Sequence, residues 1–130
     1  NSIYEIRILV VDDNTDLLRL LQEQLTDAGY RHIQTVRSCA EAKRAFAADI
    51  PQLMILDINL PDGDGFSLFR ALRGKADIPA LAVPRNLVRN GPEYQALSPR
   101  ILRIHDMEDS VFEFLVEIEL ILFLYILSLD

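Results

Sequence analysis

Short apolar runs alternate along this chain with segments in which apolar residues recur at helical spacing. The runs are rich in Val, Ile, Leu or Ala and are short enough to be buried strands. The periodic segments between them are typical of amphipathic helices. Strands that alternate with helices indicate an α/β fold with a parallel sheet. On this pattern we expect strands at 6–11, 33–36, 53–56, 80–83 and 101–104, and helices at 15–28, 38–48, 66–74 and 110–128.

Local signals and composition support this division. Gly29 follows the first periodic segment, and glycine commonly ends a helix. Ser38 and Glu41 have the spacing of a capping box, which satisfies free N–H groups at the start of a helix. Of the 130 residues, 50% are hydrophobic and 25% are charged, which favours a packed core over disorder. With no internal repeat or linker, the sequence predicts one domain over residues 1–130.

Aspartates follow two of the expected strands at their carboxyl ends. Asp12 and Asp13 close the first strand, and Asp57 closes the third. In an open parallel sheet, ligands bind beyond the carboxyl ends of the strands, near the point where the strand order reverses. If these strands are neighbours, three carboxylates converge on one cleft and repel one another. A hard divalent cation such as Mg²⁺ relieves that repulsion, so the pattern predicts a magnesium site.

Asp57 is the candidate nucleophile, because it is single, ends a strand and is followed by a constrained turn. With a cation neutralising nearby charge, its carboxylate can attack phosphorus and form an acyl phosphate. A lone aspartate after a strand is more often a turn former or a helix cap. Asp62 and Asp64 lie in the turn sequence "PDGDG" and are interpreted in that plainer way.

Two stretches resemble the receiver domain of two-component response regulators, namely "ILVVDDNTDLLRLLQEQL" and "LMILDINLPDGDGFSLFRALR". The resemblance implies a flavodoxin-like fold. Its doubly wound sheet would have five parallel strands in the order 2-1-3-4-5, flanked by helices. The resemblance therefore sharpens the expectation of an α/β fold into a specific topology.

The same resemblance implies a role for each acidic residue. It places Asp12 and Asp13 on the family's acidic pair and Asp57 on its phosphorylated aspartate. The backbone carbonyl of Asn59 falls among the Mg²⁺ ligands. A sensor histidine kinase or phosphotransfer protein would donate the phosphoryl group. The domain would not be a classical enzyme, because it catalyses only the modification of its own aspartate.

The last third of the chain departs from the family pattern. Receivers place Ser or Thr after the fourth strand, whereas this chain has Pro84, which has neither a hydroxyl nor an N–H. They place a lysine after the fifth strand, and "RILRIHDM" contains none. Arg103 or His105 is the candidate replacement, the first as a planar cation and the second only when protonated. Arg85 is a further candidate for contact with the phosphoryl group.

Charge and cysteine usage limit the partners. The formal net charge of −7 argues against direct contact of this domain with nucleic acid or anionic lipid. Cys39 is the only cysteine and no signal peptide is visible, so we expect a reducing, cytoplasmic location. The apolar run 120–127 is too short to span a membrane. We expect it to be exposed and to mediate homodimerisation or the docking of an output domain.

Three functions stay open on the sequence alone. The first is a phosphoacceptor signalling domain that uses Asp57 and Mg²⁺. The second is a pseudo-receiver that acts as an interaction module without phosphorylation, which Pro84 and the missing lysine suggest. The third is a Mg²⁺-dependent phosphohydrolase. It ranks last because such enzymes often place a second carboxylate where this chain has the amide Asn59.

Overall fold

The computed structural model describes residues 3–57, 59–76, 78–83 and 100–102. Their main feature is a five-stranded sheet in the order β2-β1-β3-β6-β7. The pairs β1–β2, β1–β3 and β3–β6 are parallel, so these strands carry their carboxyl ends to one edge of the sheet. The strands span β1 Arg7–Val11, β2 His32–Val36, β3 Leu53–Asp57, β6 Ala80–Val83 and β7 Arg100–Leu102.

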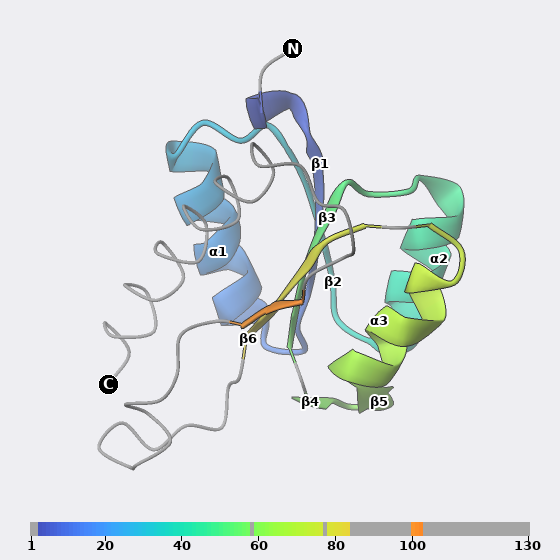
Figure 1. Ribbon diagram of the computed structural model, residues 1–130. Helices are drawn as coiled ribbons and strands as arrows, with labels where there is room; N and C mark the ends of the chain where they lie inside the picture. The colour runs from blue at the N-terminus through green and yellow to red at the C-terminus, as the bar shows by residue number, and fades with distance from the viewer. Residues whose placement is uncertain (1–2, 58, 77, 84–99, 103–130) are drawn as a thin grey trace.

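Helices cover both faces of the sheet, as a doubly wound fold requires. Helix α1 lies on one face, and α2 and α3 lie on the other (Figure 1). A short 3₁₀ helix precedes β1, and a two-stranded hairpin follows β3. The bounds are η1 Ile3–Glu5, α1 Thr15–Asp27, α2 Cys39–Ala48, β4 Asn59–Leu60, β5 Gly63–Asp64 and α3 Gly65–Arg73.

The alternation of side chains along β1 divides the core into two apolar clusters. Ile8 and Val10 join the cluster under α1, whereas Leu9 and Val11 join the cluster under α2 and α3. All five residues of β3 are buried, which is expected of a central strand covered on both faces. This double coverage explains why the apolar runs of the sequence are continuous rather than alternating.

The boundaries of the three expected helices that the structure describes agree closely with the predictions. Asn14 caps α1 by accepting the N–H of Leu17, and Gly29 follows the helix with φ +110°, a backbone conformation that favours glycine. Ser38 caps α2 by accepting the N–H of Glu41 at 3.1 Å. The carboxylate of Glu41 in turn accepts the N–H of Arg37, one residue before the cap. Polar side chains at strand-to-helix junctions therefore set where both helices begin.

The predicted strand order is confirmed, but the direction of the last strand is not. We expected five parallel strands, whereas β7 pairs antiparallel to β6, with Leu81 opposite Ile101. A parallel neighbour needs a crossover of about a dozen residues, usually a helix, whereas an antiparallel neighbour does not. An apolar run of this length can be buried in either direction, so the pattern that predicted the strand did not determine its direction.

Several sequence predictions concern residues outside the described part of the chain. The final helix at 110–128 and the apolar run 120–127 lie there, so their exposure and role stay predictions. The extent of the domain over residues 1–130 is likewise still a prediction. Among the residues that the structure does describe, no helix is long and apolar enough to cross a lipid bilayer.

Candidate functional site

Three carboxylates meet at the carboxyl edge of the sheet. Strands β1 and β3 are neighbours with Val11 opposite Leu56, so the residues that follow, Asp12 and Asp57, emerge side by side. One carboxylate oxygen from each of Asp12, Asp13 and Asp57 lies within 4.8 Å of the others. Asp12 and Asp57 are only 3% and 1% exposed, and Asp13 is half-buried. The structure thus brings together the three acids that the sequence predicted to converge.

Asp12 and Asp57 each begin a local turn of the same type. Oδ1 of Asp12 accepts the N–H of Asn14 at 2.9 Å, and Oδ1 of Asp57 accepts the N–H of Asn59 at 3.1 Å. An aspartate that bonds the backbone two residues ahead forms an Asx turn, which needs no partner from elsewhere in the fold. These turns fix the orientation of both carboxylates as the chain leaves the sheet.

The backbone of α3 begins directly against Asp57. A Cβ placed on Gly65 would overlap with the carbonyl oxygen of Asp57 and would lie 2.9 Å from Cδ1 of Leu56. Glycine is therefore required where the chain returns from the hairpin to the end of β3. This contact anchors one end of the loop that carries Asn59.

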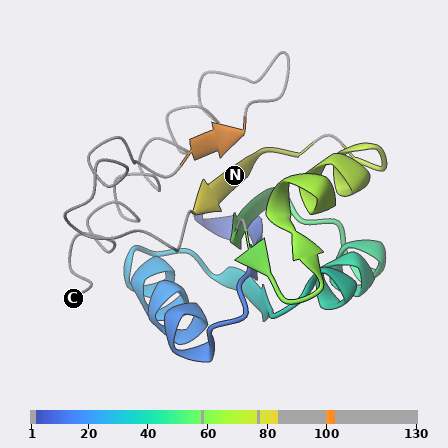
Figure 2. The ribbon, with the colours of Figure 1, turned by 90° about the horizontal axis from the view of Figure 1, so that it is seen from below.

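The hairpin β4–β5 closes that loop. Asn59 pairs with Asp64, and Leu60 pairs with Gly63. Figure 2 looks at this end of the molecule and shows the hairpin on the side of the sheet that carries α2 and α3. The sequence predicted only a turn here, because each of these strands is two residues long and shows no periodicity.

Asp64 and Asp62 both cap helices. Asp64 accepts the N–H of Ser67 at 3.0 Å and its hydroxyl at 2.6 Å, and these hydrogen bonds lower the pKa of Asp64. Asp62 instead reaches α2, where it accepts the N–H groups of Cys39 at 2.8 Å and Ala40 at 3.0 Å. Those bonds lower the pKa of Asp62. Asp64 caps its own helix, as predicted, whereas no sequence signal linked Asp62 to a helix 22 residues earlier.

The acidic cluster suits a small, hard cation. Carboxylate oxygens are the ligands that Mg²⁺ prefers, and it is usually bound by one or two of them together with phosphate oxygens and water. Two of the three carboxylates are almost fully buried, so their charges are poorly screened by solvent. The predicted fourth ligand, the carbonyl of Asn59, belongs to a residue already bonded to Asp57.

The remaining predicted site residues cannot be placed. Pro84, Arg85, Arg103 and His105 all lie outside the described residues. Whether Arg103 or His105 takes the place of the family lysine therefore stays a prediction from the sequence.

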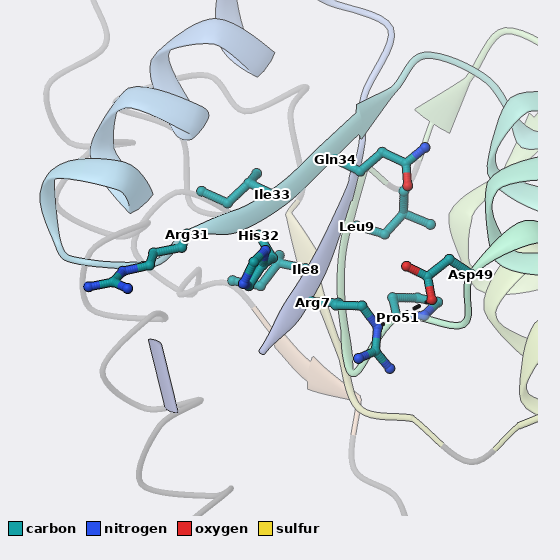
Figure 3. A pocket seen from close by; sticks show the side chains of 9 residues that line it. All are labelled: Arg7, Ile8, Leu9, Arg31, His32, Ile33, Gln34, Asp49 and Pro51. Carbon is teal, nitrogen blue, oxygen red and sulfur yellow. Dashed lines mark ion pairs between the residues drawn. The ribbon is translucent and has the colours of Figure 1, made fainter. Parts of the chain in front are cut away.

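A hollow of about 350 Å³ lies at the opposite edge of the sheet (Figure 3). It opens at the amino ends of β1 and β2, where four of its lining residues take part in ion pairs. Arg7 approaches Asp49 to 3.4 Å, and Arg31 and His32 both approach Glu5. The hollow is therefore separate from the acidic cluster. Its lining comprises Arg7, Ile8, Leu9, Arg31, His32, Ile33, Gln34, Asp49 and Pro51.

Comparison with known protein families identifies the family of this chain. The model of the response regulator receiver domain matches residues 8–87 of this chain. This chain belongs to the response regulator receiver domain family. The match includes β1 from Ile8 onward, β3 and the whole acidic cluster, so this receiver domain has its three acids within the family segment.

Curated relatives of this receiver domain are longer proteins. The probable transcriptional regulator ycf27 of Pyropia yezoensis is 37% identical over 75 residues, which cover 58% of this chain and 30% of the relative. The transcriptional regulatory protein KdpE of Mycobacterium tuberculosis is 40% identical over 76 residues, covering 58% of this chain and 33% of the relative. The receiver domain thus matches about a third of the length of these regulators.

Solved structures agree with this assignment. The non-phosphorylated HemR receiver domain of Leptospira biflexa is 26% identical, with a TM-score of 0.61 and 97% coverage of both chains. A sensor protein from Polaromonas sp. JS666 is 38% identical, with a TM-score of 0.58 over 62% of this chain and 66% of that one. A CheY-like receiver domain from Methylobacillus flagellatus, 21% identical with a TM-score of 0.62, supports the fold alone. The flavodoxin-like α/β fold predicted from the sequence is confirmed.

Proposed function

We propose that this receiver domain accepts a phosphoryl group on Asp57 in a Mg²⁺-dependent phosphorelay. The observation that carries the proposal is the approach of the Asp12, Asp13 and Asp57 carboxylates to within 4.8 Å at the carboxyl edge of the sheet. Like charges at this distance are unfavourable unless a cation or protons offset them. A site that concentrates negative charge in this way is suited to bind a metal ion and then a phosphoryl group.

Each residue of the cluster has a distinct part in the proposed reaction. The carboxylates of Asp12, Asp13 and Asp57 would hold Mg²⁺ together with the backbone carbonyl of Asn59. Bound there, the ion would neutralise charge on the phosphoryl oxygens and so lower the barrier to attack by an anion. The N–H of Asn59 holds Oδ1 of Asp57 and thereby fixes the direction from which its carboxylate approaches phosphorus.

The proposed transfer exchanges one phosphorus bond for another. A carboxylate oxygen of Asp57 forms a bond to phosphorus as the bond from phosphorus to the donor's histidine nitrogen breaks. The histidine takes up a proton, and Asp57 becomes an acyl phosphate. The donor would be a sensor histidine kinase or a phosphotransfer protein. The domain would thus promote its own modification and would not act as a classical enzyme on a separate substrate.

The relatives suggest what lies downstream. KdpE and ycf27 are named as transcriptional regulators, so we propose a cytoplasmic role in which another domain or protein contacts nucleic acid. The NtrC4 receiver, 28% identical with a TM-score of 0.54 over 58% of this chain, is described as a beryllofluoride-activated dimer. We propose that the apolar run 120–127 provides either a homodimer contact or a docking surface for an output domain.

Incubation with acetyl phosphate and Mg²⁺, followed by intact-mass measurement, tests the proposal. We expect one phosphoryl group per chain in the wild-type protein and none in Asp57→Asn. Chelation of the metal should also abolish the increment. Asp16→Asn serves as a matched control, because Asp16 is an exposed aspartate of α1 that pairs with Arg19 instead of joining the cluster.

Other outcomes of this experiment identify the alternatives. Absence of both the mass increment and Mg²⁺ binding would indicate a phosphorylation-independent interaction module. Rapid release of phosphate from added phosphate monoesters would indicate a phosphohydrolase. Rates for Arg103→Ala and His105→Ala, measured in parallel, would show which of the two replaces the family lysine, since only the substitution of that residue should slow phosphorylation.

A further inference from the structure

We propose that Asp62 is a positioning residue of the phosphorylation site. It ties the tip of the β4–β5 hairpin to the start of α2 and thereby holds Asn59 against Asp57. The inference rests on the proposed function for its effect on Mg²⁺ binding. The tether itself is a separate structural claim that can be tested without any metal.

The tether consists of two hydrogen bonds between elements far apart in the sequence. Oδ1 of Asp62 accepts the N–H of Cys39 at 2.8 Å, and Oδ2 accepts that of Ala40 at 3.0 Å. An ionised carboxylate at the positive end of a helix makes stronger hydrogen bonds than a neutral acceptor. Both oxygens are engaged, so the tip of the hairpin is held in position and in orientation.

The N-terminus of α2 divides its free donors between two residues. The first four N–H groups of a helix have no partner within it. Asp62 accepts those of Cys39 and Ala40, and the Ser38 hydroxyl accepts that of Glu41, after which the bond from Ala42 to the Ser38 carbonyl begins the helical pattern. Ser38 alone would leave two donors to solvent. The remote aspartate therefore completes the cap, and the same bonds link the hairpin to the helix.

The hairpin depends on contacts at both of its ends. Each strand has only two residues, and isolated two-stranded hairpins are marginally stable at best in water. At its base, Gly65 lies against the carbonyl of Asp57. At its tip, Gly63 packs so closely on Cys39 that an added Cβ would lie 3.1 Å from Sγ, and Leu60 enters the same apolar cluster. Asp62 provides the polar part of this tip contact.

Release of the hairpin tip from α2 would change the geometry of the phosphorylation site. Asn59 pairs with Asp64 across the hairpin, and its N–H is bonded to Oδ1 of Asp57. Movement of the hairpin would therefore lengthen that hydrogen bond and displace the Asn59 carbonyl, which is a proposed metal ligand. Groups that orient metal ligands from outside typically change metal affinity by about 10–100-fold when they are removed.

The test compares Asp62→Ala, Asp62→Asn and Ser38→Ala in the full chain. Two quantities are measured for each variant. One is the amide hydrogen-exchange rate of Asn59, followed by NMR without metal, and the other is the Mg²⁺ dissociation constant. We expect Asp62→Ala to raise the Mg²⁺ dissociation constant by about tenfold or more and to accelerate the exchange of the Asn59 amide. Asp62→Asn keeps one acceptor oxygen and should have an intermediate effect. Ser38→Ala removes the other cap of α2 but not the tether, so both quantities should stay at their wild-type values.

Equal effects of Asp62→Ala and Ser38→Ala on both measurements would overturn the proposal, because Asp62 would then act only as a helix cap. If Asp62→Ala does not fold, the comparison of Asp62→Asn with Ser38→Ala decides the matter in the same way. If the wild-type chain binds no Mg²⁺, the proposed function fails. The exchange rate of Asn59 still decides the tether, which is supported only when the Asp62 variants alone accelerate it.

Discussion

The backbone of Gly65 lies so close to the carbonyl oxygen of Asp57 that no side chain fits between them. This contact joins the first residue of α3 to the last residue of β3. It forces the intervening segment to fold back within a few residues, which it does as the hairpin β4–β5. The hairpin that carries Asn59 therefore begins and ends next to Asp57.

We predict that Gly65→Ala destabilises the domain by about 1–3 kcal/mol, because an added methyl group has to displace packed backbone and the side chain of Leu56. Gly74→Ala is the matched control. A Cβ at Gly74 would meet only the carbonyl oxygen of Ala71, at 3.6 Å, and its backbone is already helical. That variant should be unchanged or up to about 1 kcal/mol more stable. Urea denaturation measures both, and equal stabilities would contradict the prediction.

Asp13→Asn should stabilise the metal-free protein. Two carboxylates 4.8 Å apart repel each other by about 3.5 kcal/mol at an effective dielectric constant near 20, so removing one of the three should raise the free energy of unfolding. The same substitution should reduce the stabilisation that Mg²⁺ provides by binding the folded state. Urea denaturation with Mg²⁺ and with a chelator tests both effects. Asp16→Asn changes the charge equally outside the cluster, so a matching gain in stability there would refute the argument.

The stability contributed by Asp62 and Asp64 should disappear in acid. Their hydrogen bonds lower both pKa values from the ordinary 3.8. A carboxyl whose folded pKa lies below its unfolded value stabilises the fold above that unfolded value, and the contribution is lost as the pH falls through the folded pKa. The double variant Asp62→Asn with Asp64→Asn should be less stable than wild type at neutral pH. The difference in urea midpoint between the double variant and the wild type should shrink as the pH drops below 3.8. A difference that stays constant with pH would count against a stabilising role of these two ionised carboxylates.

Arg7→Ala should leave phosphorylation and Mg²⁺ binding unchanged. Arg7 lies at the amino end of β1, which at about 3.3 Å per residue is roughly 17 Å from the acidic edge. Its ion pair with Asp49 is 48% and 68% exposed at the two side chains, so its loss should cost about 0–1 kcal/mol. Intact-mass measurement after incubation with acetyl phosphate checks the phosphorylation, and urea denaturation checks the stability. A large fall in phosphorylation would show that the two edges of the sheet are coupled.

Much of the sheet could be predicted from the sequence because its strands are buried on both faces. The run 53–56 falls within β3, all of whose residues are buried, and 80–83 coincides with β6. The positions of Asp12, Asp13 and Asp57 followed from the rule that parallel strands end at one edge. The sequence was therefore sufficient to predict those features that depend only on a strand and the residues next to it.

The features that sequence reasoning missed all depend on contacts between distant segments. The direction of β7 depends on how the chain returns to β6, and short apolar runs carry no information on direction. The hairpin after Asp57 depends on Gly65 and Asp62, whose partners lie in β3 and α2. An aspartate that caps a helix of another segment looks the same in sequence as one that forms a turn.

Cys39 provides the protein with its own chemical reporter. It is the only cysteine of the chain, it is buried against Gly63, and burial raises the pKa of its thiol. The thiolate is the reactive form of cysteine, so alkylation of Cys39 should be slow while the hairpin covers it. The reaction should occur mainly in molecules whose hairpin has moved away from α2. The rate at which a maleimide alkylates this sulfur would therefore report how often the loop next to Asp57 opens, with no residue substituted.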